Sequence, residues 1–305
     1  MNVKSVSIEI TNNCNNQCLI CPQGHNLINR KGYMSNETFN ILIKRLEHIK
    51  REVNLELHGI GEPLLHPKIS QFISTSVQRG FFTTICTNAI LLTLEKAKEL
   101  HESGLNRIVV SLETKENYER VRCSNIYERV LNNIMKVAEN IPEIELEIFM
   151  IYVGNEMPYD FDDFKKQFGN SKIRFNQFRG SNWLGKIPFE GLLEKKGSHV
   201  LKKICPLFIQ YCSINFEGQM RHCYLDFNTE YVIGDMKKVD FDTLWFSDYR
   251  KEIIKKMQDG RYDEFMPCAE CVFPFVQDEK SSESLLLGKE DFKRPEMQLL
   301  SKIKS

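Results

Sequence analysis

The stretch CNNQCLIC, residues 14–21, places three cysteines within eight residues, directly after the apolar run VSIEI. Thiolates are soft ligands that select iron–sulfur clusters or zinc over hard cations. A structural zinc site needs four closed ligands, and the nearest spare ligand, His25, would give an unusual C-x3-C-x2-C-x3-H arrangement. The spacing of Cys14, Cys18 and Cys21 therefore favours a cluster with one iron left without a protein ligand, and zinc is the alternative.

The composition describes a neutral chain that can form a sizeable core. Of 305 residues, 42% are hydrophobic, and Lys+Arg and Asp+Glu both number 41, so we expect no nucleic-acid partner. The N-terminus lacks a signal-peptide pattern, and no apolar run approaches the roughly 18 residues of a membrane span. We therefore expect a soluble, cytoplasmic protein with no membrane partner, whose ten cysteines are reduced and bind metal.

Strand-like and helix-like runs alternate from residue 3 to about residue 178. β-branched and apolar runs predict strands, and amphipathic runs with cap residues such as Ser35 and Thr93 predict helices. The expected strands are 3–10, 53–59, 81–87, 106–113, 144–153 and 172–178, and the expected helices are 35–49, 68–80, 93–104, 125–140 and 160–169. The alternation predicts an α/β fold with a parallel sheet curled into a partial (β/α)6 TIM-like barrel or a whole barrel, with its chemistry at the carboxyl ends of the strands.

The alternation stops after residue 180. Residues 205–275 predict a β-hairpin within 208–227, turning near Gly218, and one helix over 240–258. Too few elements remain for a second large core, so we expect a small appendage held together by metal. The predicted domains are a core barrel at 1–180, a connector at 181–204, the appendage at 205–275 and a polar helical tail at 276–305.

A second set of cysteines falls in the appendage. Cys205 and Cys223 have the pattern C-x12-G-x4-C, and Cys268 and Cys271 follow as CAEC. These four thiolates can fill every position of one metal site. Ligand type alone leaves zinc and an iron–sulfur cluster open.

The triplet C-x3-C-x2-C after a first barrel strand resembles the radical S-adenosyl-L-methionine (SAM) superfamily. The resemblance implies a 4Fe-4S cluster whose open iron is chelated by the amino and carboxylate groups of SAM. One electron then cleaves the sulfonium and releases a 5′-deoxyadenosyl radical that abstracts hydrogen from an unactivated C–H bond. It also implies flavodoxin or ferredoxin as the reductant.

Further motifs follow the next strands in the order that the family has them. The resemblance implies that HGIGEPLL, with Gly61 and Glu62, meets the SAM ammonium through its backbone, and that Asn88 of CTNAILL faces the ribose. Ala89 stands where the family's Thr-Asn-Gly element has glycine. Ser111 of VVSLET and Arg122 of ERVRCS fall where the family binds the SAM carboxylate.

The second cysteine pattern resembles the twitch domain, a shortened form of the SPASM domain. The stretch HCYLDFNTEYVIGDMKKVDFDTLWFSDYR, with Asp226 and Asn228, looks like the deoxy-scyllo-inosamine dehydrogenases of aminoglycoside biosynthesis. The resemblance implies one auxiliary 4Fe-4S cluster on Cys205, Cys223, Cys268 and Cys271. With every iron carrying a thiolate, electron transfer is its expected role.

We therefore expect an oxidoreductase that dehydrogenates an alcohol carbon of a sugar, cyclitol or similar small polar metabolite. Asp226 is the candidate that takes the proton, and a carboxylate bonded to local backbone is the alternative interpretation. Cys86 is expected to be a buried hydrophobe, whereas Cys123 or Cys212 could deliver hydrogen to a substrate radical, as an epimerase requires. His58 and His66 are expected to be packing or turn residues, and Trp183 and Trp245 core residues.

Two other functions stay open. A radical SAM enzyme of this type could oxidise, cross-link or epimerise a peptide or protein, although we expect a chain that starts at its first strand to lack a leader-recognition domain. A zinc-bound binding module without catalysis is the other alternative, and it predicts a colourless protein.

Overall fold

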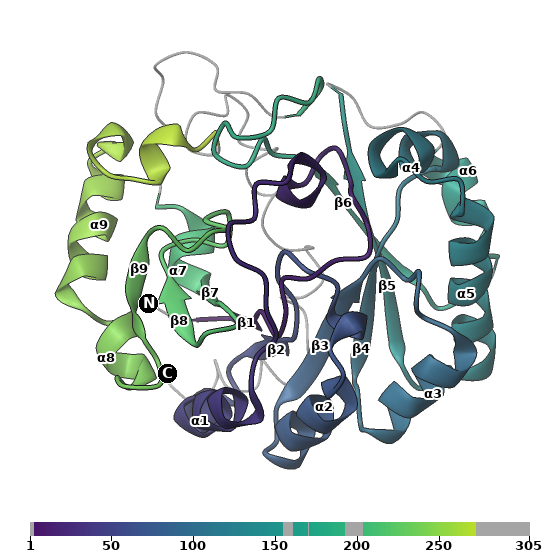
Figure 1. The fold of residues 1–305 in the computed structure, drawn as a ribbon, viewed down its shortest axis with the longest axis horizontal. Helices are drawn as coiled ribbons and strands as arrows, with labels where there is room; N and C mark the ends of the chain where they lie inside the picture. The colour runs from purple at the N-terminus through teal and green to yellow at the C-terminus, as the bar shows by residue number, and fades with distance from the viewer. Residues whose placement is uncertain (1–2, 155–160, 170, 193–203, 273–305) are drawn as a thin grey trace, which may run out of the picture.

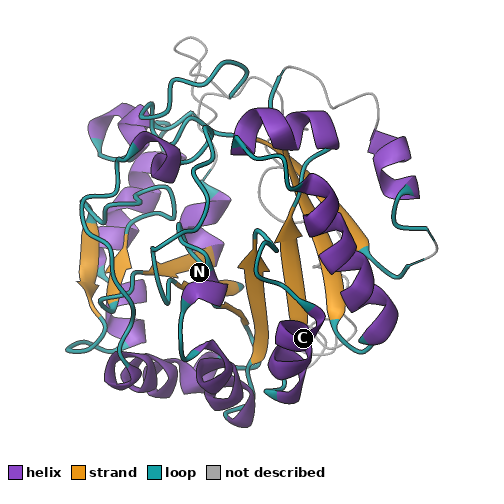
Figure 2. Ribbon diagram, turned by 45° about the vertical axis from the view of Figure 1, so that its right-hand side comes forward, coloured by secondary structure: helices purple, strands orange, loops and turns teal. Residues whose placement is uncertain are grey.

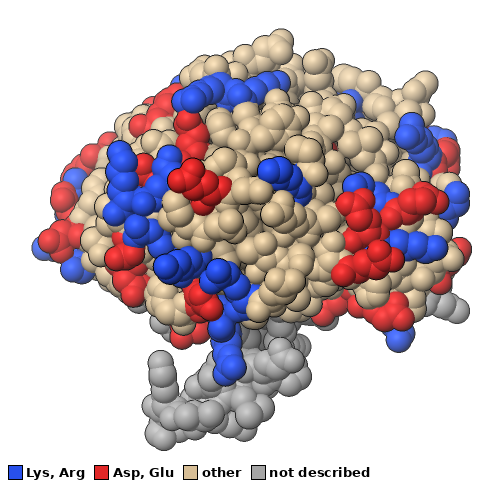
Figure 3. Space-filling view, turned by 60° about the horizontal axis from the view of Figure 1, so that its bottom comes forward, with Lys and Arg blue, Asp and Glu red and all other residues tan. Residues whose placement is uncertain are grey.

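The computed structural model describes residues 3–154, 161–169, 171–192 and 204–272. Three predicted segments lie wholly or partly outside these ranges. They are the tail at 276–305, most of the second half of the connector, and the first residue of the helix expected at 160–169. None of the helices within them is long and apolar enough to span a membrane. On the face in Figure 3, basic and acidic side chains lie beside one another without a large field of one sign.

Six parallel strands follow one another in chain order through one sheet (Figure 1). Each pairs in parallel with the next, as the predicted α/β barrel requires, and that prediction is confirmed. The strands are β1 (Ser5–Ile8), β2 (Asn54–Glu56), β3 (Phe82–Thr87), β4 (Arg107–Ser111), β5 (Glu145–Tyr152) and β6 (Arg174–Arg179).

Helices surround the strands on the outside (Figure 2). They are α1 (Asn36–Leu46), α2 (Ile69–Gln78), α3 (Leu94–Glu102), α4 (Lys115–Arg122), α5 (Tyr127–Asn140) and α6 (Phe161–Lys166), with short 3-10 turns η1 (Pro22–His25), η2 (Glu47–Ile49) and η3 (Pro63–Leu65). The predicted caps are present, because the Ser35 and Thr93 side chains accept hydrogen bonds from the first turns of α1 and α3. Helix α4 is an addition that the sequence patterns did not predict.

The core lies between this helical layer and the sheet. Strand β1 is buried along its whole length, as expected for a parallel strand covered on both faces. Phe39 of α1 stacks on Phe72 of α2 with ring centroids 4.0 Å apart. Burial of such apolar surface is the main stabilising term for the barrel.

The C-terminal region extends the same sheet. It consists of α7 (Pro206–Gln210), β7 (Tyr211–Ile214), β8 (Gln219–Arg221), β9 (Val232–Asp235), α8 (Phe241–Trp245), α9 (Asp248–Gln258), η4 (Tyr262–Glu264) and η5 (Cys268–Glu270). Strand β7 pairs in parallel with β1, and the predicted hairpin of β7 and β8 is present. The helix expected at 240–258 is divided, because Ser247 caps a new helix, α9. Residues 208–210, expected in a strand, belong to a helix that starts at Pro206.

A buried ion pair joins the barrel to this region. Glu9, after β1, receives a hydrogen bond from Arg221 of β8 over 3.1 Å, and each side chain is 1% exposed. Glu9 also accepts a hydrogen bond from the Ile60 amide. A Cβ atom on Gly59 would lie 2.4 Å from the Glu9 carboxylate, so glycine is needed at this contact. The pair fixes the hairpin against the loops that follow β1 and β2.

Replacing Arg221 with methionine leaves the Glu9 carboxylate buried without its cation. The free energy of unfolding is expected to fall by about 3–5 kcal/mol, measured by urea denaturation of the cluster-loaded protein. The control is Lys251→Met, which removes an exposed pair with Asp248 and should cost less than about 1 kcal/mol. Equal stability of the two variants would contradict the role given to the buried pair.

Candidate active site

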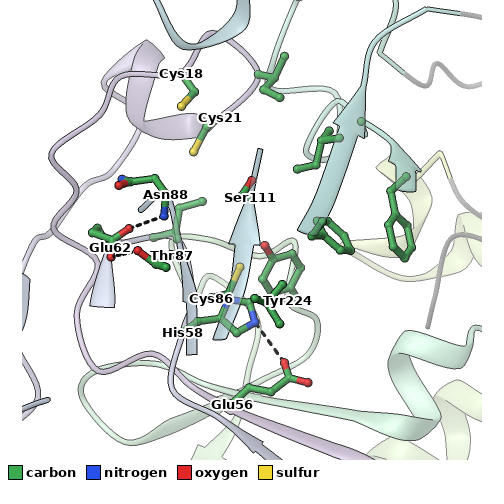
Figure 4. A pocket seen from close by; sticks show the side chains of 18 of the residues that line it. Cys18, Cys21, Glu56, His58, Glu62, Cys86, Thr87, Asn88, Ser111 and Tyr224 are labelled. Atoms are coloured by element: carbon green, nitrogen blue, oxygen red, sulfur yellow. Dashed lines mark hydrogen bonds and ion pairs between the residues drawn. The ribbon is translucent and has the colours of Figure 1, made fainter. Parts of the chain in front are cut away.

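A cavity of about 400 Å³ lies inside the barrel. Figure 4 shows Cys18 and Cys21 at one end of it and Glu56 and His58 at the other. Polar side chains from five strands line the second end, which we call the floor: Asn54, Glu56, Thr84, Arg107, Glu147 and Asn176. His58, Cys86 and Tyr211 line the same cavity. The cavity thus has the three thiols of the first set at one end and the polar floor at the other.

The loop between β1 and η1 carries the three thiols. The Cys21 amide donates to the Cys18 carbonyl, and the Gly24 amide donates to the Cys21 carbonyl, both over 3.0 Å. Gly24 packs so closely that a Cβ atom there would lie 2.3 Å from the Cys18 carbonyl oxygen. His25 contacts the Leu19 carbonyl through Nε2 at 2.7 Å, so this nitrogen is already engaged. The backbone therefore presents three cysteines and leaves the nearest histidine in another contact.

All three thiols line the same end of the cavity (Figure 4). Thiolates are the usual ligands of iron–sulfur clusters, and a cubane binds each cysteine through a different iron, so three cysteines leave its fourth iron open. Without metal, burial raises the pKa of Cys14 to about 11 and that of Cys21 to about 12. Metal binding would hold such thiols deprotonated.

The Gly-Glu-Pro turn packs directly on the cysteine loop. A Cβ atom on Gly61 would lie 2.4 Å from the Thr11 carbonyl oxygen, and the Glu62 amide donates to the Asn13 carbonyl over 2.8 Å. The Glu62 carboxylate accepts hydrogen bonds from the Leu64 amide, the Thr87 hydroxyl and the Asn88 amide. Its burial raises its pKa, although these hydrogen bonds oppose the shift. The carboxylate positions neighbouring loops, while contact of this turn with SAM stays a prediction.

Asn88 lies beside the first cysteine. Its Nδ2 donates to Asn15 Oδ1 over 2.8 Å and is 4.0 Å from Cys14 Sγ. Ala89 has a φ of 57°, a left-handed conformation in which glycine is the unstrained residue. This explains the glycine of the Thr-Asn-Gly pattern. Asn88 thus lies at the thiol end of the cavity, as a residue contacting a cluster-bound nucleotide must, and its role stays a prediction.

The structure brings Ser111 and Arg122 together. Arg122 Nη2 donates to Ser111 Oγ over 2.7 Å, and Nε donates to Glu113 Oε2 over 2.6 Å. Burial lowers the pKa of Arg122, but the Glu113 carboxylate outweighs this and raises it, so the guanidinium is a fixed cation. Glu113 was not predicted from the sequence. The pair is placed on the cavity wall, where it could bind a carboxylate, and that function stays a prediction.

The second cysteine set also comes together. All four thiols line one small pocket between α7, the loop after β8 and η5: Cys205, Cys223, Cys268 and Cys271. Burial raises the pKa of Cys223 to about 12. The set contains four thiolates, which suits an iron–sulfur cluster with every corner filled.

His222 is a neighbour of this set that the sequence patterns did not identify. Its Nε2 is 3.5 Å from Cys268 Sγ, and its Nδ1 is 3.0 Å from the Tyr249 hydroxyl. Burial, with a contribution from Arg250, lowers the pKa of His222 to about 3, so the imidazole is neutral. If the hydroxyl donates to Nδ1, the ring proton is on Nε2 and faces the sulfur.

Asp226 does not line the main cavity. Its carboxylate accepts hydrogen bonds from the Glu230 and Tyr231 amides over 2.9 and 2.8 Å. This geometry favours the alternative that the sequence left open, a carboxylate bonded to local backbone. Asn228 connects the two regions, since its Nδ2 donates to the carbonyl of Leu27, which follows η1.

Among the remaining thiols and tryptophans, Cys86 and Trp183 differ from the sequence expectations. Cys86 lines the cavity (Figure 4), Cys212 is in the main core, and Cys123 is exposed at the end of α4. Trp245 is in the core as expected. Trp183 instead lines the cavity and donates its Nε1 proton to the Ile20 carbonyl, because the connector passes over the cysteine loop.

Two family profiles match the chain. The Radical SAM superfamily profile covers residues 8–167, and the SPASM profile, described as an iron-sulfur cluster-binding domain, covers residues 205–272. They support two 4Fe-4S clusters and SAM as the cofactors, as expected from the two cysteine sets.

Known proteins resemble the chain over different lengths. A tungsten-containing aldehyde ferredoxin oxidoreductase cofactor-modifying protein of Pyrococcus furiosus is 24% identical over 83% of this chain and 80% of that protein. A probable GTP 3′,8-cyclase of Methanocaldococcus jannaschii is 34% identical, but the match spans 45% of this chain and 46% of the cyclase.

Solved structures share the fold at low identity. BtrN in complex with AdoMet and 2-DOIA has a TM-score of 0.63 and 16% identity over 91% of this chain and 96% of BtrN. Streptococcus suis SuiB bound to precursor peptide SuiA has a TM-score of 0.64 and 14% identity over 89% of this chain and 70% of SuiB.

Changing Cys14, Cys18 and Cys21 together to alanine is expected to remove one cluster. Iron in anaerobically reconstituted protein should fall from about eight to about four atoms per chain, because the second cysteine set still holds its 4Fe-4S cluster. Iron and sulfide assays measure this. Cys123→Ala, at an exposed thiol outside both sets, is the control and should keep all the iron. Full iron in the triple variant would refute the assignment.

Replacing His222 with phenylalanine removes the imidazole whose Nε2 lies 3.5 Å from Cys268 Sγ. Donation to a thiolate stabilises the reduced cluster, so the midpoint potential of the auxiliary cluster should become more negative. A redox titration followed by electron paramagnetic resonance measures this in the variant that also lacks the first cysteine set. His48→Phe, at an exposed histidine, is the control, and an unchanged potential for His222→Phe would show that the contact has no such effect.

Proposed function

This chain belongs to the radical SAM superfamily, and we propose that it dehydrogenates an alcohol carbon of a sugar, cyclitol or similar small polar metabolite. When bound, SAM and the two clusters supply a 5′-deoxyadenosyl radical and an electron acceptor. Cys14, Cys18 and Cys21 would hold the first cluster, and the four appendage thiols the second. A flavodoxin or ferredoxin reductant and a cytoplasmic location are parts of the same proposal.

The polar floor is the observation that carries this proposal. It offers carboxylates, amides and a hydroxyl in a cavity that also contains the first thiol set. Alcohol groups donate and accept hydrogen bonds at once, so such a floor can orient a polyhydroxylated molecule. BtrN, with the same fold, was solved with the small molecule 2-DOIA, which supports a small polar substrate here.

We assign three sets of groups to SAM binding. They are the backbone of Gly61 and Glu62, the Asn88 side chain beside Cys14, and the paired Ser111 and Arg122. Their places on the cavity wall support this assignment. Arg122 can bind the methionyl carboxylate by charge-assisted hydrogen bonds while Glu113 fixes its orientation.

Cys86 favours a second candidate, in which hydrogen is returned to the substrate radical, as in epimerisation of a peptide or metabolite. Its thiol lines the cavity, and burial raises its pKa to about 12, so it keeps its S–H hydrogen. SuiB, which was solved with a precursor peptide, shares the fold.

Product analysis in D₂O separates the two candidates. Anaerobic enzyme with SAM and dithionite is incubated with 2-deoxy-scyllo-inosamine, myo-inositol and glucosamine as probes. Dehydrogenation predicts a carbonyl product in equal amount to 5′-deoxyadenosine and no solvent deuterium on carbon, both measured by mass spectrometry. Deuterium on carbon that disappears in Cys86→Ala would establish hydrogen return instead, and SAM cleavage without a carbonyl product from any probe would contradict dehydrogenation.

A further inference from the structure

Glu56 of the cavity floor forms one hydrogen-bonded group with His58 and Tyr211, and the sequence patterns did not identify this group. His58 Nε2 is 3.1 Å from Glu56 Oε2, the Tyr211 hydroxyl donates to the same oxygen over 2.8 Å, and His58 Nε2 is 3.1 Å from that hydroxyl. All three line the cavity. Figure 4 shows the His58 ring between the Glu56 carboxylate and the Cys86 and Tyr224 side chains.

Both parts of the sheet hold this group. Glu56 and His58 are two residues apart at the end of β2, so they share one face of the strand. Tyr211 comes from β7, and β1 lies between β7 and β2. Ser7 of β1 donates its hydroxyl proton to the His58 carbonyl over 2.7 Å. The position of His58 therefore depends on three adjacent strands.

The hydrogen bonds assign the tautomer of His58. Burial would raise the pKa of Glu56, but the hydrogen bond and the charge interaction with His58 lower it, as do hydrogen bonds from Tyr211 and Ser5, so Glu56 is an ionised acceptor. A neutral imidazole that meets a carboxylate at Nε2 carries its proton there. Nδ1 then has the free lone pair, which is the arrangement of a general base oriented by a carboxylate.

The other titratable groups around the cavity are less suited to take a proton. Burial raises the pKa of Tyr211, Tyr224 and Cys86, so they stay protonated. Two carboxylates already have cationic partners, since Glu113 pairs with Arg122 and Glu147 lies 3.8 Å from Arg107. The Glu62 carboxylate is at the thiol end, where three hydrogen bonds from neighbouring loops occupy its oxygens. Asp226 is outside the cavity.

We propose that His58 is the proton acceptor in the dehydrogenation, with Glu56 and Tyr211 as its positioning residues; this inference rests on the proposed function. With SAM and both clusters bound, the substrate C–H hydrogen atom would go to the 5′-deoxyadenosyl radical. The hydroxyl proton would go to His58 Nδ1 and the remaining electron to the auxiliary cluster, leaving a C=O bond. The hydrogen atom, proton and electron are thereby all accounted for.

The test follows carbonyl formation from whichever of the three probes the wild type oxidises. His58→Ala is expected to slow it by about 100-fold or more, with more 5′-deoxyadenosine formed per carbonyl product. Added imidazole should restore much of the rate in His58→Ala by occupying the vacated space, an effect that a purely structural role would not produce. His58→Gln keeps a side chain of similar size, so its rate of carbonyl formation should fall as far as that of His58→Ala, and added imidazole should not restore it. His48→Ala, at the exposed histidine paired with Asp242, should behave as the wild type.

The outcomes separate the two proposals. The assignment of His58 as proton acceptor is supported if both His58 variants form the carbonyl product slowly and added imidazole restores the rate of the alanine variant alone. Wild-type rates in the His58 variants, or loss that imidazole does not restore, overturn the role of His58 while dehydrogenation stands. A wild type that forms no carbonyl product overturns the proposed function, and the assignment of His58 falls with it.

Discussion

The buried carboxylate of Glu62 is the contact on which the arrangement of the cavity depends. It accepts hydrogen bonds from its own turn and from the Thr87 and Asn88 end of β3, while its amide is bound to the Asn13 carbonyl. One residue therefore connects the loops after β1, β2 and β3. A buried acceptor of this kind is costly unless its partners are in place, so the three loops have one favourable arrangement, and it is the one that places Asn88 beside Cys14.

Much of the fold could be predicted because the decisive patterns are local. The β-branched runs of β3 and β4 and the caps Ser35 and Thr93 act within a few residues. The pairing of β7 with β1 could not be predicted in this way, because the register of Ser5 with Tyr211 joins segments about two hundred residues apart. Strand β7 is also short, and it directly follows helix α7, which begins at Pro206.

The same difference between local and long-range patterns decides which parts of the site could be predicted. Cysteine spacing is a local property, so both thiol sets could be read from the sequence, and the structure brings the second set to one pocket. The Glu56, His58 and Tyr211 group is assembled by the β1 and β7 pairing, and without that pairing His58 looks like part of a turn. Asp226 is predicted only by resemblance to a motif, whereas its two backbone hydrogen bonds depend on the conformation of the loop after β8, which residue spacing does not predict.

The proposed proton acceptor and the first thiol set lie at opposite ends of the cavity (Figure 4). Tyr224 lines the cavity, its ring centroid is 6.1 Å from that of His58, and the residue before it, Cys223, belongs to the auxiliary thiol set. The radical that removes hydrogen would arise at the opposite end, beside Cys14. A substrate held between the two ends would thus lose its hydrogen atom at one end and its proton at the other. This separation lets one cavity hold both SAM and the proton acceptor without competition for space.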